Sequence, residues 1–167
     1  MGAPTDPTDP TDPAAPAAPT DPAARLRVLA GAEPVPAGDL LSLLPATGPL
    51  WVARLDGAAM ADVAGVFAQF RQRLRLPDWF GGNWDALDDC LRDLAWLPAD
   101  ACLIVVAGAE RVLAARPRER GILFEVLARA AGSRAPAVGV PVTVVLLCAP
   151  DHAGRLRAEI AGPPGAD

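Results

Sequence analysis

Residues 83–107, which decide the fold class, read NWDALDDCLRDLAWLPADACLIVVA. In the first half of this stretch, apolar residues recur at i, i+3, i+4 and i+7, the spacing of one buried helix face. Asn83 is suited to cap the start of this helix, and Pro98 ends it. In the second half, residues 102–107 form a continuous apolar run, as in a strand that is covered on both faces. The stretch therefore predicts a helix that leads into a buried strand.

The same alternation continues on both sides of this stretch. Residues 50–55 have the composition of a strand, and the apolar spacing of residues 63–74 is that of a helix. Downstream, a helix is expected from Pro117 to Gly132, followed by a last buried strand at residues 142–147. Strands that alternate with helices of crossover length predict an α/β fold, a small three-stranded parallel sheet packed with helices.

The two ends of the chain differ from this middle part. Residues 1–24 repeat Thr-Asp-Pro, and their frequent prolines block helix and sheet hydrogen bonding, so we expect a disordered tail. The next segment is ambiguous, because residues 26–29 fit a short edge strand and residues 40–44 fit a helical turn or two. The chain divides into a tail (1–24), an extension of uncertain structure (25–49), one domain (50–150) and a short C-terminal helix with a tail (151–167).

The charge of the chain limits the classes of partner that it can bind. The net charge is −5, which disfavours nucleic acid, because a phosphate backbone requires arginine and lysine. The longest uncharged runs are interrupted by proline and glycine and are shorter than the roughly 18 to 20 apolar residues of a membrane span. We therefore expect neither a nucleic acid nor a membrane, and a basic protein is the natural complement.

The N-terminus and the cysteines indicate the compartment. The sequence after Met1 has neither a basic nor an apolar signal region, which predicts a cytoplasmic protein. Three widely spaced cysteines, Cys90, Cys102 and Cys148, lie within apolar patterns, which predicts buried reduced thiols and no disulfide framework or metal site. The chain has 15 arginines and no lysine, as is typical of a GC-rich bacterial genome.

The helix after Asn83 carries a cluster of acids opposite its apolar face. At about 100° per residue, the outward positions are occupied by Asp85, Asp88, Asp89 and Asp93. Residues 78–93 contain five aspartates and one arginine, for a net charge of −4. The simplest interpretation is a solvated helix face, but like charges three and four residues apart repel and destabilise a helix. A cluster of this kind therefore also indicates a surface selected for binding.

Residues 76–91, LPDWFGGNWDALDDCL, resemble the loop and second helix of the barstar family, intracellular inhibitors of small secreted ribonucleases. The order of strands and helices over residues 50–148 fits as well. The resemblance implies an antitoxin-like bacterial inhibitor of a guanyl-preferring ribonuclease, acting as a monomer without a cofactor. Asp89 would enter the phosphate-binding site of the enzyme with Asp85 beside it, and Trp79 would pack over the guanine-recognition edge. The other implied partner-binding residues are Asp88, Asn83, Gly81, Trp84 and Asp93.

This sequence departs from the family pattern at two positions of the helix and in the later helix. Asp88 stands where an aromatic residue is common, and Arg92 stands where a small polar residue is usual. Arg92 is four residues from Asp88 and three from Asp89, so it can pair with an acid of its own helix. The later helix usually offers an acidic contact, and here the nearest residues are Glu125 and Arg129.

Two alternatives use the same residues. An enzyme would use Asp85 and Asp89 as acid and base, but both project from one helix face and do not flank a substrate, so we expect no enzymatic activity. A barstar-like binding module for a different basic protein is the stronger rival. The loop aromatics are open to two interpretations as well, because Trp79 and Phe80 can either close the core or border a binding surface.

Overall fold

The computed structural model describes residues 25–31, 48–132 and 139–161, together with Gly38, Leu40 and Leu44. Within these residues the chain forms a four-stranded, all-parallel sheet with strand order β1-β4-β3-β2. The strands are β1 (Leu26–Ala30), β2 (Leu50–Asp56), β3 (Ala101–Ala107) and β4 (Val142–Cys148). The α/β class and the parallel sheet are confirmed, whereas the prediction of three strands was wrong.

The additional strand, β1, lies at the edge of the sheet next to β4. Its register runs from Leu26 opposite Val144 to Ala30 opposite Cys148. With five residues and partly buried side chains, β1 is stabilised by its pairing with a strand near the other end of the chain. A sequence pattern reports local periodicity and not such distant pairing, so residues 26–29 fitted an edge strand without establishing one. The expected tail at residues 1–24 lies outside the described residues.

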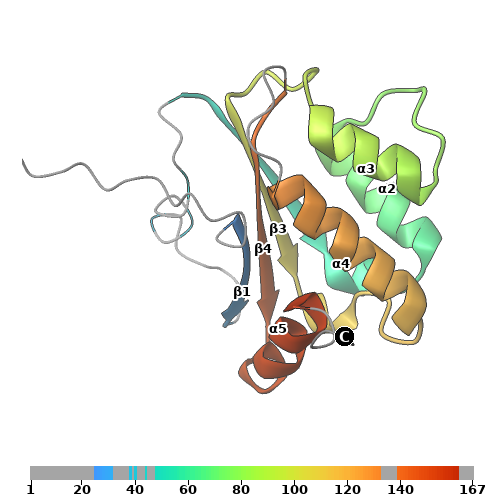
Figure 1. Cartoon of the computed structure of the whole chain (residues 1–167), viewed down its shortest axis with the longest axis vertical. Helices are drawn as coiled ribbons and strands as arrows, with labels where there is room; N and C mark the ends of the chain where they lie inside the picture. The colour runs from blue at the N-terminus through green and yellow to red at the C-terminus, as the bar shows by residue number, and fades with distance from the viewer. Residues whose placement is uncertain are drawn as a thin grey trace, which may run out of the picture.

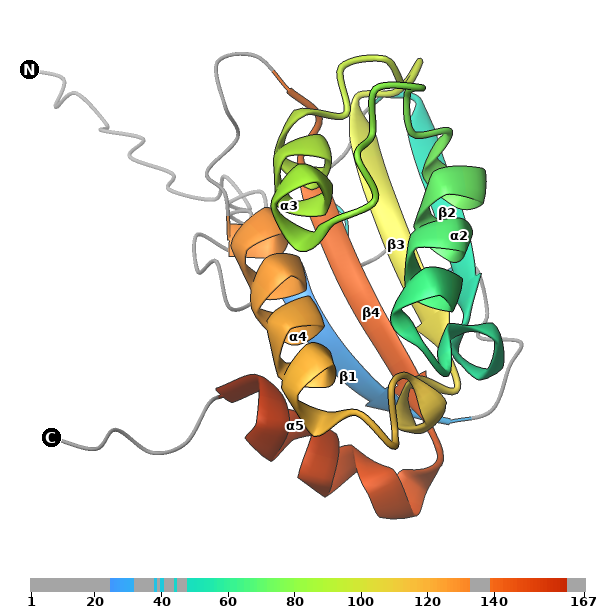
Figure 2. The ribbon, with the colours of Figure 1, turned by 90° about the vertical axis from the view of Figure 1, so that its right-hand side faces the viewer.

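The helices in the connections from β2 to β3 and from β3 to β4 cover one face of the sheet. In Figure 1, α2 (Val63–Leu74), α3 (Trp84–Asp93) and α4 (Pro117–Gly132) form a layer on one side of the strands, and Figure 2 shows this layer in front of the sheet. The other elements between and after the strands are η2 (Gly57–Met60), η3 (Ala109–Arg111), η4 (Pro150–His152) and α5 (Ala153–Ala161).

Alternate residues of the central strands face opposite sides of the sheet, and both sides are buried. On β3, Ile104 packs under the helix layer, while Leu103 and Val105 pack on the other face with Leu40. This explains why residues 102–107 are a continuous apolar run, since neither face meets water. Leu40 thus lies on the face of the sheet opposite the helix layer.

All three cysteines are buried and unpaired, as predicted. Burial raises the pKa of the Cys102 thiol on β3 to about 12. Burial also raises the pKa of Cys90 on α3, and the nearby carboxylates of Asp89 and Asp93 raise it further. The thiols therefore remain protonated near neutral pH and pack as small apolar groups.

Candidate functional site

The helix α3 is short, and both of its ends are fixed by specific contacts. At the start, the side chain of Asn83 accepts a hydrogen bond from the backbone N–H of Ala86 at 2.8 Å, which confirms the predicted cap. At the end, Leu94 adopts a left-handed conformation with φ 48°, and its N–H donates to the carbonyl of Cys90. Leu87, Cys90 and Leu91 bury the inner face of the helix. The acids are consequently held on the outer face of a fixed helix.

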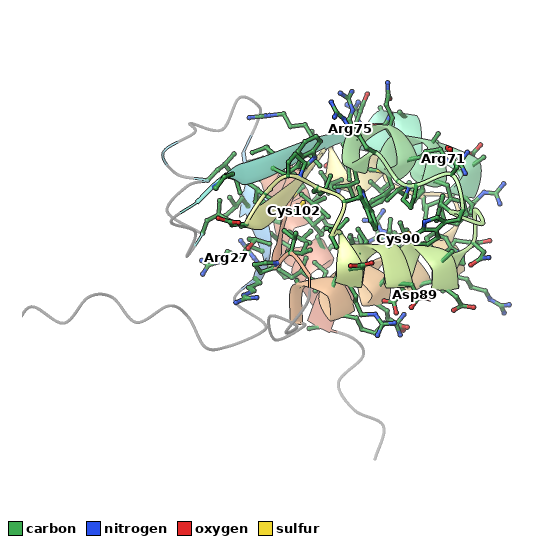
Figure 3. The ribbon with its side chains drawn as sticks, turned by 90° about the horizontal axis from the view of Figure 1, so that it is seen from above. Arg27, Arg71, Arg75, Asp89, Cys90 and Cys102 are labelled. Atoms are coloured by element: carbon green, nitrogen blue, oxygen red, sulfur yellow. The ribbon has the colours of Figure 1, made fainter. Side chains whose placement is uncertain are left out.

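The four acids of α3, here called the acidic cluster (Asp85, Asp88, Asp89 and Asp93), do not share one environment. Asp85, Asp89 and Asp93 are exposed, and the side chain of Asp89 is 67% exposed. Figure 3 shows Asp89 on the outer side of the helix, whereas Cys90 points toward the interior. Asp93 accepts a hydrogen bond from the N–H of Ala95 at 3.3 Å. Asp85 and Asp89, one turn apart, thus present their carboxylates to solvent.

Asp88 is the exception, because it lies against α4. Its side chain is only 14% exposed, and its Oδ1 is 3.2 Å from Nε of Arg129. Its Oδ2 is 3.3 Å from Nη2 of Arg92, and the same nitrogen donates to Oδ1 of Asp89 at 2.7 Å. Arg92 therefore bridges two members of the acidic cluster, as its spacing predicted. Arg129 ties α3 to α4, while Glu125 is exposed.

The loop before α3 presents one tryptophan to solvent. Trp79 is 63% exposed, and its ring meets the edge of the Trp96 ring at 6.2 Å and 89°. Trp96 is anchored by a hydrogen bond from its Nε1 to the carbonyl of Leu74 at 3.0 Å. The structure thus supports Trp79 as an exposed aromatic group on a fixed base. Trp96 had no distinguishing signal in the sequence, because it follows the helix outside any periodic pattern.

The other two aromatic residues of this region face inward. Phe80 is 3% exposed and lies edge-on to Phe67 at 5.7 Å, so it closes the core. Trp84, which the resemblance placed among the partner-binding residues, is half-buried and packs on Phe67 at 5.0 Å. Arg71 holds the loop from outside, with its Nη2 donating to the carbonyl of Phe80 at 3.1 Å. These contacts position the loop beside α3.

The two glycines of the loop shape the entry into α3. Gly82 has φ 65°, a conformation that side chains rarely adopt, and it precedes the capping residue. Gly81 is exposed, and a Cβ at that position would lie 3.3 Å from Nδ2 of Asn83. A side chain at Gly81 would therefore crowd the cap. Both glycines, together with Asn83, determine how the backbone enters the first turn of α3.

The arrangement offers electrostatic recognition of a cation. The exposed carboxylates of Asp85 and Asp89 come from one face of one helix, and such a face meets a partner from a single direction. Among the described residues, no group of three or more histidine, cysteine or acidic side chains is placed to hold a metal ion. In the same part of the chain, no helix has the length and apolar character needed to cross a bilayer.

Comparison with protein families gives a match that spans this site. A family model described as Barstar (barnase inhibitor) matches residues 50–146, which is more than half of the chain. The matched range runs from β2 into β4 and contains the whole of α3 and the loop before it. No curated protein matches the chain.

Proposed function

The chain belongs to the barstar family of barnase inhibitors, and we propose that it inhibits a small guanyl-preferring bacterial ribonuclease. The acidic cluster would cover the basic active site of the enzyme and keep RNA out. The protein itself needs no catalytic group for this task, in agreement with a family of inhibitors. We place the complex in the bacterial cytoplasm, where it would protect the cell that makes the nuclease.

The exposed carboxylate of Asp89 is the observation that carries this proposal. Its side chain is 67% exposed on a helix that is capped at both ends, so it is held in place without being buried. A carboxylate on a rigid support can replace a substrate phosphate and meet arginine or lysine fixed in a cleft. Asp85, one turn earlier, adds a second exposed charge in the same direction.

Trp79 supports the proposal from the loop. An exposed tryptophan costs little conformational entropy when it is ordered in a complex, because its side chain has only two rotatable bonds. Its ring is already braced by Trp96. We infer that Trp79 packs against the rim of the cleft while Asp89 enters it, as expected for an aromatic group beside a charged contact.

A second candidate function is recognition of a different basic protein by the same face. The observation that favours it is the engagement of Asp88 by Arg92 and Arg129, which removes one acid from the exposed set. On α4, the residue that contacts the acidic cluster is basic. A partner that matches this charge pattern can differ from the ribonucleases that other family members bind.

Asp89→Ala tests the proposed function. We expect the parent protein to inhibit a guanyl-preferring ribonuclease stoichiometrically and the variant to inhibit at least roughly tenfold more weakly, because enzyme cations remain unpaired in its complex. The stability of the free protein should change by less than about 0.5 kcal/mol, since an exposed ion pair contributes little and alanine favours the helix. Inhibition constants and urea denaturation curves give both quantities.

Asp151→Ala is the matched control, because Asp151 is an exposed acid on η4, outside the acidic cluster. It removes the same charge and should leave inhibition unchanged. An equal loss of inhibition in both variants would show that Asp89 acts only through the net charge of the protein. A folded parent that inhibits none of several such ribonucleases would favour the different basic partner.

A further inference from the structure

The guanidinium of Arg92 forms ion pairs with two carboxylates of the acidic cluster. Nη2 of Arg92 is 2.7 Å from Oδ1 of Asp89 and 3.3 Å from Oδ2 of Asp88. The exposed acid that the proposed function relies on is therefore already paired with a cation of its own helix. Any partner that binds Asp89 through its own cation must compete with Arg92.

The two acids differ in what remains after Arg92 moves away. Asp88 keeps a cation, because Nε of Arg129 lies 3.2 Å from its Oδ1 on the side of α4. For Asp89, the ion pair within the described part of the chain runs to Arg92. Displacement of Arg92 thus exposes one carboxylate fully and leaves the link between α3 and α4 in place.

We propose that Arg92 is a specificity-determining residue. It pairs with Asp89 in the free protein, and only a partner cation that binds Asp89 more tightly displaces it. This inference rests on the proposed function. The pair is three residues apart on one helix, and its side chains are 50% and 67% exposed, so water and salt weaken it and it can open. A partner arginine that binds Asp89 with two parallel hydrogen bonds in a dry cleft outcompetes it. A single exposed lysine binds the carboxylate of Asp89 more weakly than such an arginine does. Competition from Arg92 therefore disfavours a partner that presents only a lysine.

Arg92→Gln tests this role, because glutamine keeps the helix propensity and the polar exposed surface while it removes the guanidinium. We expect this variant to inhibit the same ribonuclease about two- to threefold more tightly than the parent, since an exposed ion pair within one helix contributes little. In the Asp89→Ala background, Arg92→Gln should give no gain, since the acid that Arg92 holds is absent. Inhibition constants for the four proteins complete the cycle.

Arg155→Gln is the charge-matched control, because Arg155 is 80% exposed on α5 and pairs with Glu159. It should leave inhibition unchanged. Equal tightening by Arg155→Gln, a full gain in the Asp89→Ala background, or no gain in Arg92→Gln would each overturn the role of Arg92 while leaving a working inhibitor. If neither parent nor variants inhibit any ribonuclease, the proposed function fails, and this inference fails with it.

Discussion

Asp88 and Asp89 are adjacent in the chain, yet their side chains lie in different environments. The rotation of about 100° between them turns Asp88 toward α4 and Asp89 toward solvent. The side chain of Asp88 is 14% exposed and that of Asp89 is 67% exposed. Asp88 therefore contributes to packing between helices, and Asp89 remains accessible to a partner.

A comparison of Asp88→Asn with Asp89→Asn should separate these roles in the free protein. We expect Asp88→Asn to lower the free energy of unfolding by about 1 kcal/mol, because it removes the charge that Arg129 and Arg92 meet at the contact of α3 with α4. Asp89→Asn should change it by less than about 0.5 kcal/mol, as for other exposed sites. Urea denaturation measures both. Equal losses would show that burial at Asp88 has no energetic consequence.

The sequence placed the acids correctly on one helix but could not separate them. A helical wheel reports the direction of each residue around its own axis, so Asp85, Asp88 and Asp89 all fall opposite the apolar face. Whether another helix approaches that face depends on tertiary packing. The contact of Asp88 with Arg129 joins residues 41 positions apart, which no local pattern encodes.

The helix α3 depends on its caps more than a long helix would. It has 10 residues, and helices of this length are marginal in water without tertiary support and capping. The Asn83 side chain satisfies one of the N–H groups that the first turn leaves open. Asn83 thereby fixes the direction in which the acidic cluster points.

Asn83→Ala should therefore lower the free energy of unfolding by about 1 kcal/mol, the usual loss when a capping side chain is removed. Fraying of the first turn should also weaken inhibition, because Asp85 lies within that turn. Asn83→Asp is the matched control, since aspartate caps equally well and should preserve stability. Thermal and urea denaturation of the two variants measure the effect. If both lose the same stability, the cap is not the cause.

The helices and inner strands could be predicted because their burial repeats with a regular period along the chain. Val63–Leu74 and Pro117–Gly132 carry one apolar stripe each, and Ala101–Ala107 is apolar throughout. The strand Leu26–Ala30 has neither property. It is an edge strand with mixed burial, and its partner, β4, is distant in sequence. The number of strands therefore could not be predicted from the local sequence pattern.

The ionisable composition of the chain is unusual and makes one measurement simple. The chain contains no tyrosine and no lysine among its 15 basic residues. Between about pH 9 and 12, the three thiols are therefore the side chains that titrate, because arginine ionises only at higher pH. Burial raises the pKa of all three thiols. For Cys148, the nearby carboxylates of Glu110 and Asp151 add to this effect, and Arg157 opposes it.

These shifts predict that the protein loses stability in alkaline solution through its cysteines. An unfolded thiol ionises near its ordinary pKa of 9.0, whereas folded Cys102 ionises near 12, so above pH 9 the folded state holds more protons than the unfolded state. The free energy of unfolding should be constant near pH 8 and fall from pH 9 upward, by up to about 1.4 kcal/mol per pH unit from Cys102. Urea denaturation at pH 7 to 11 under reducing conditions measures this slope. In Cys102→Ala, which is less stable at every pH because of the lost packing, the alkaline slope should be shallower by the same amount. An unchanged slope in that variant, or a flat profile in the parent, would show that the buried thiols do not govern the alkaline limit of the fold.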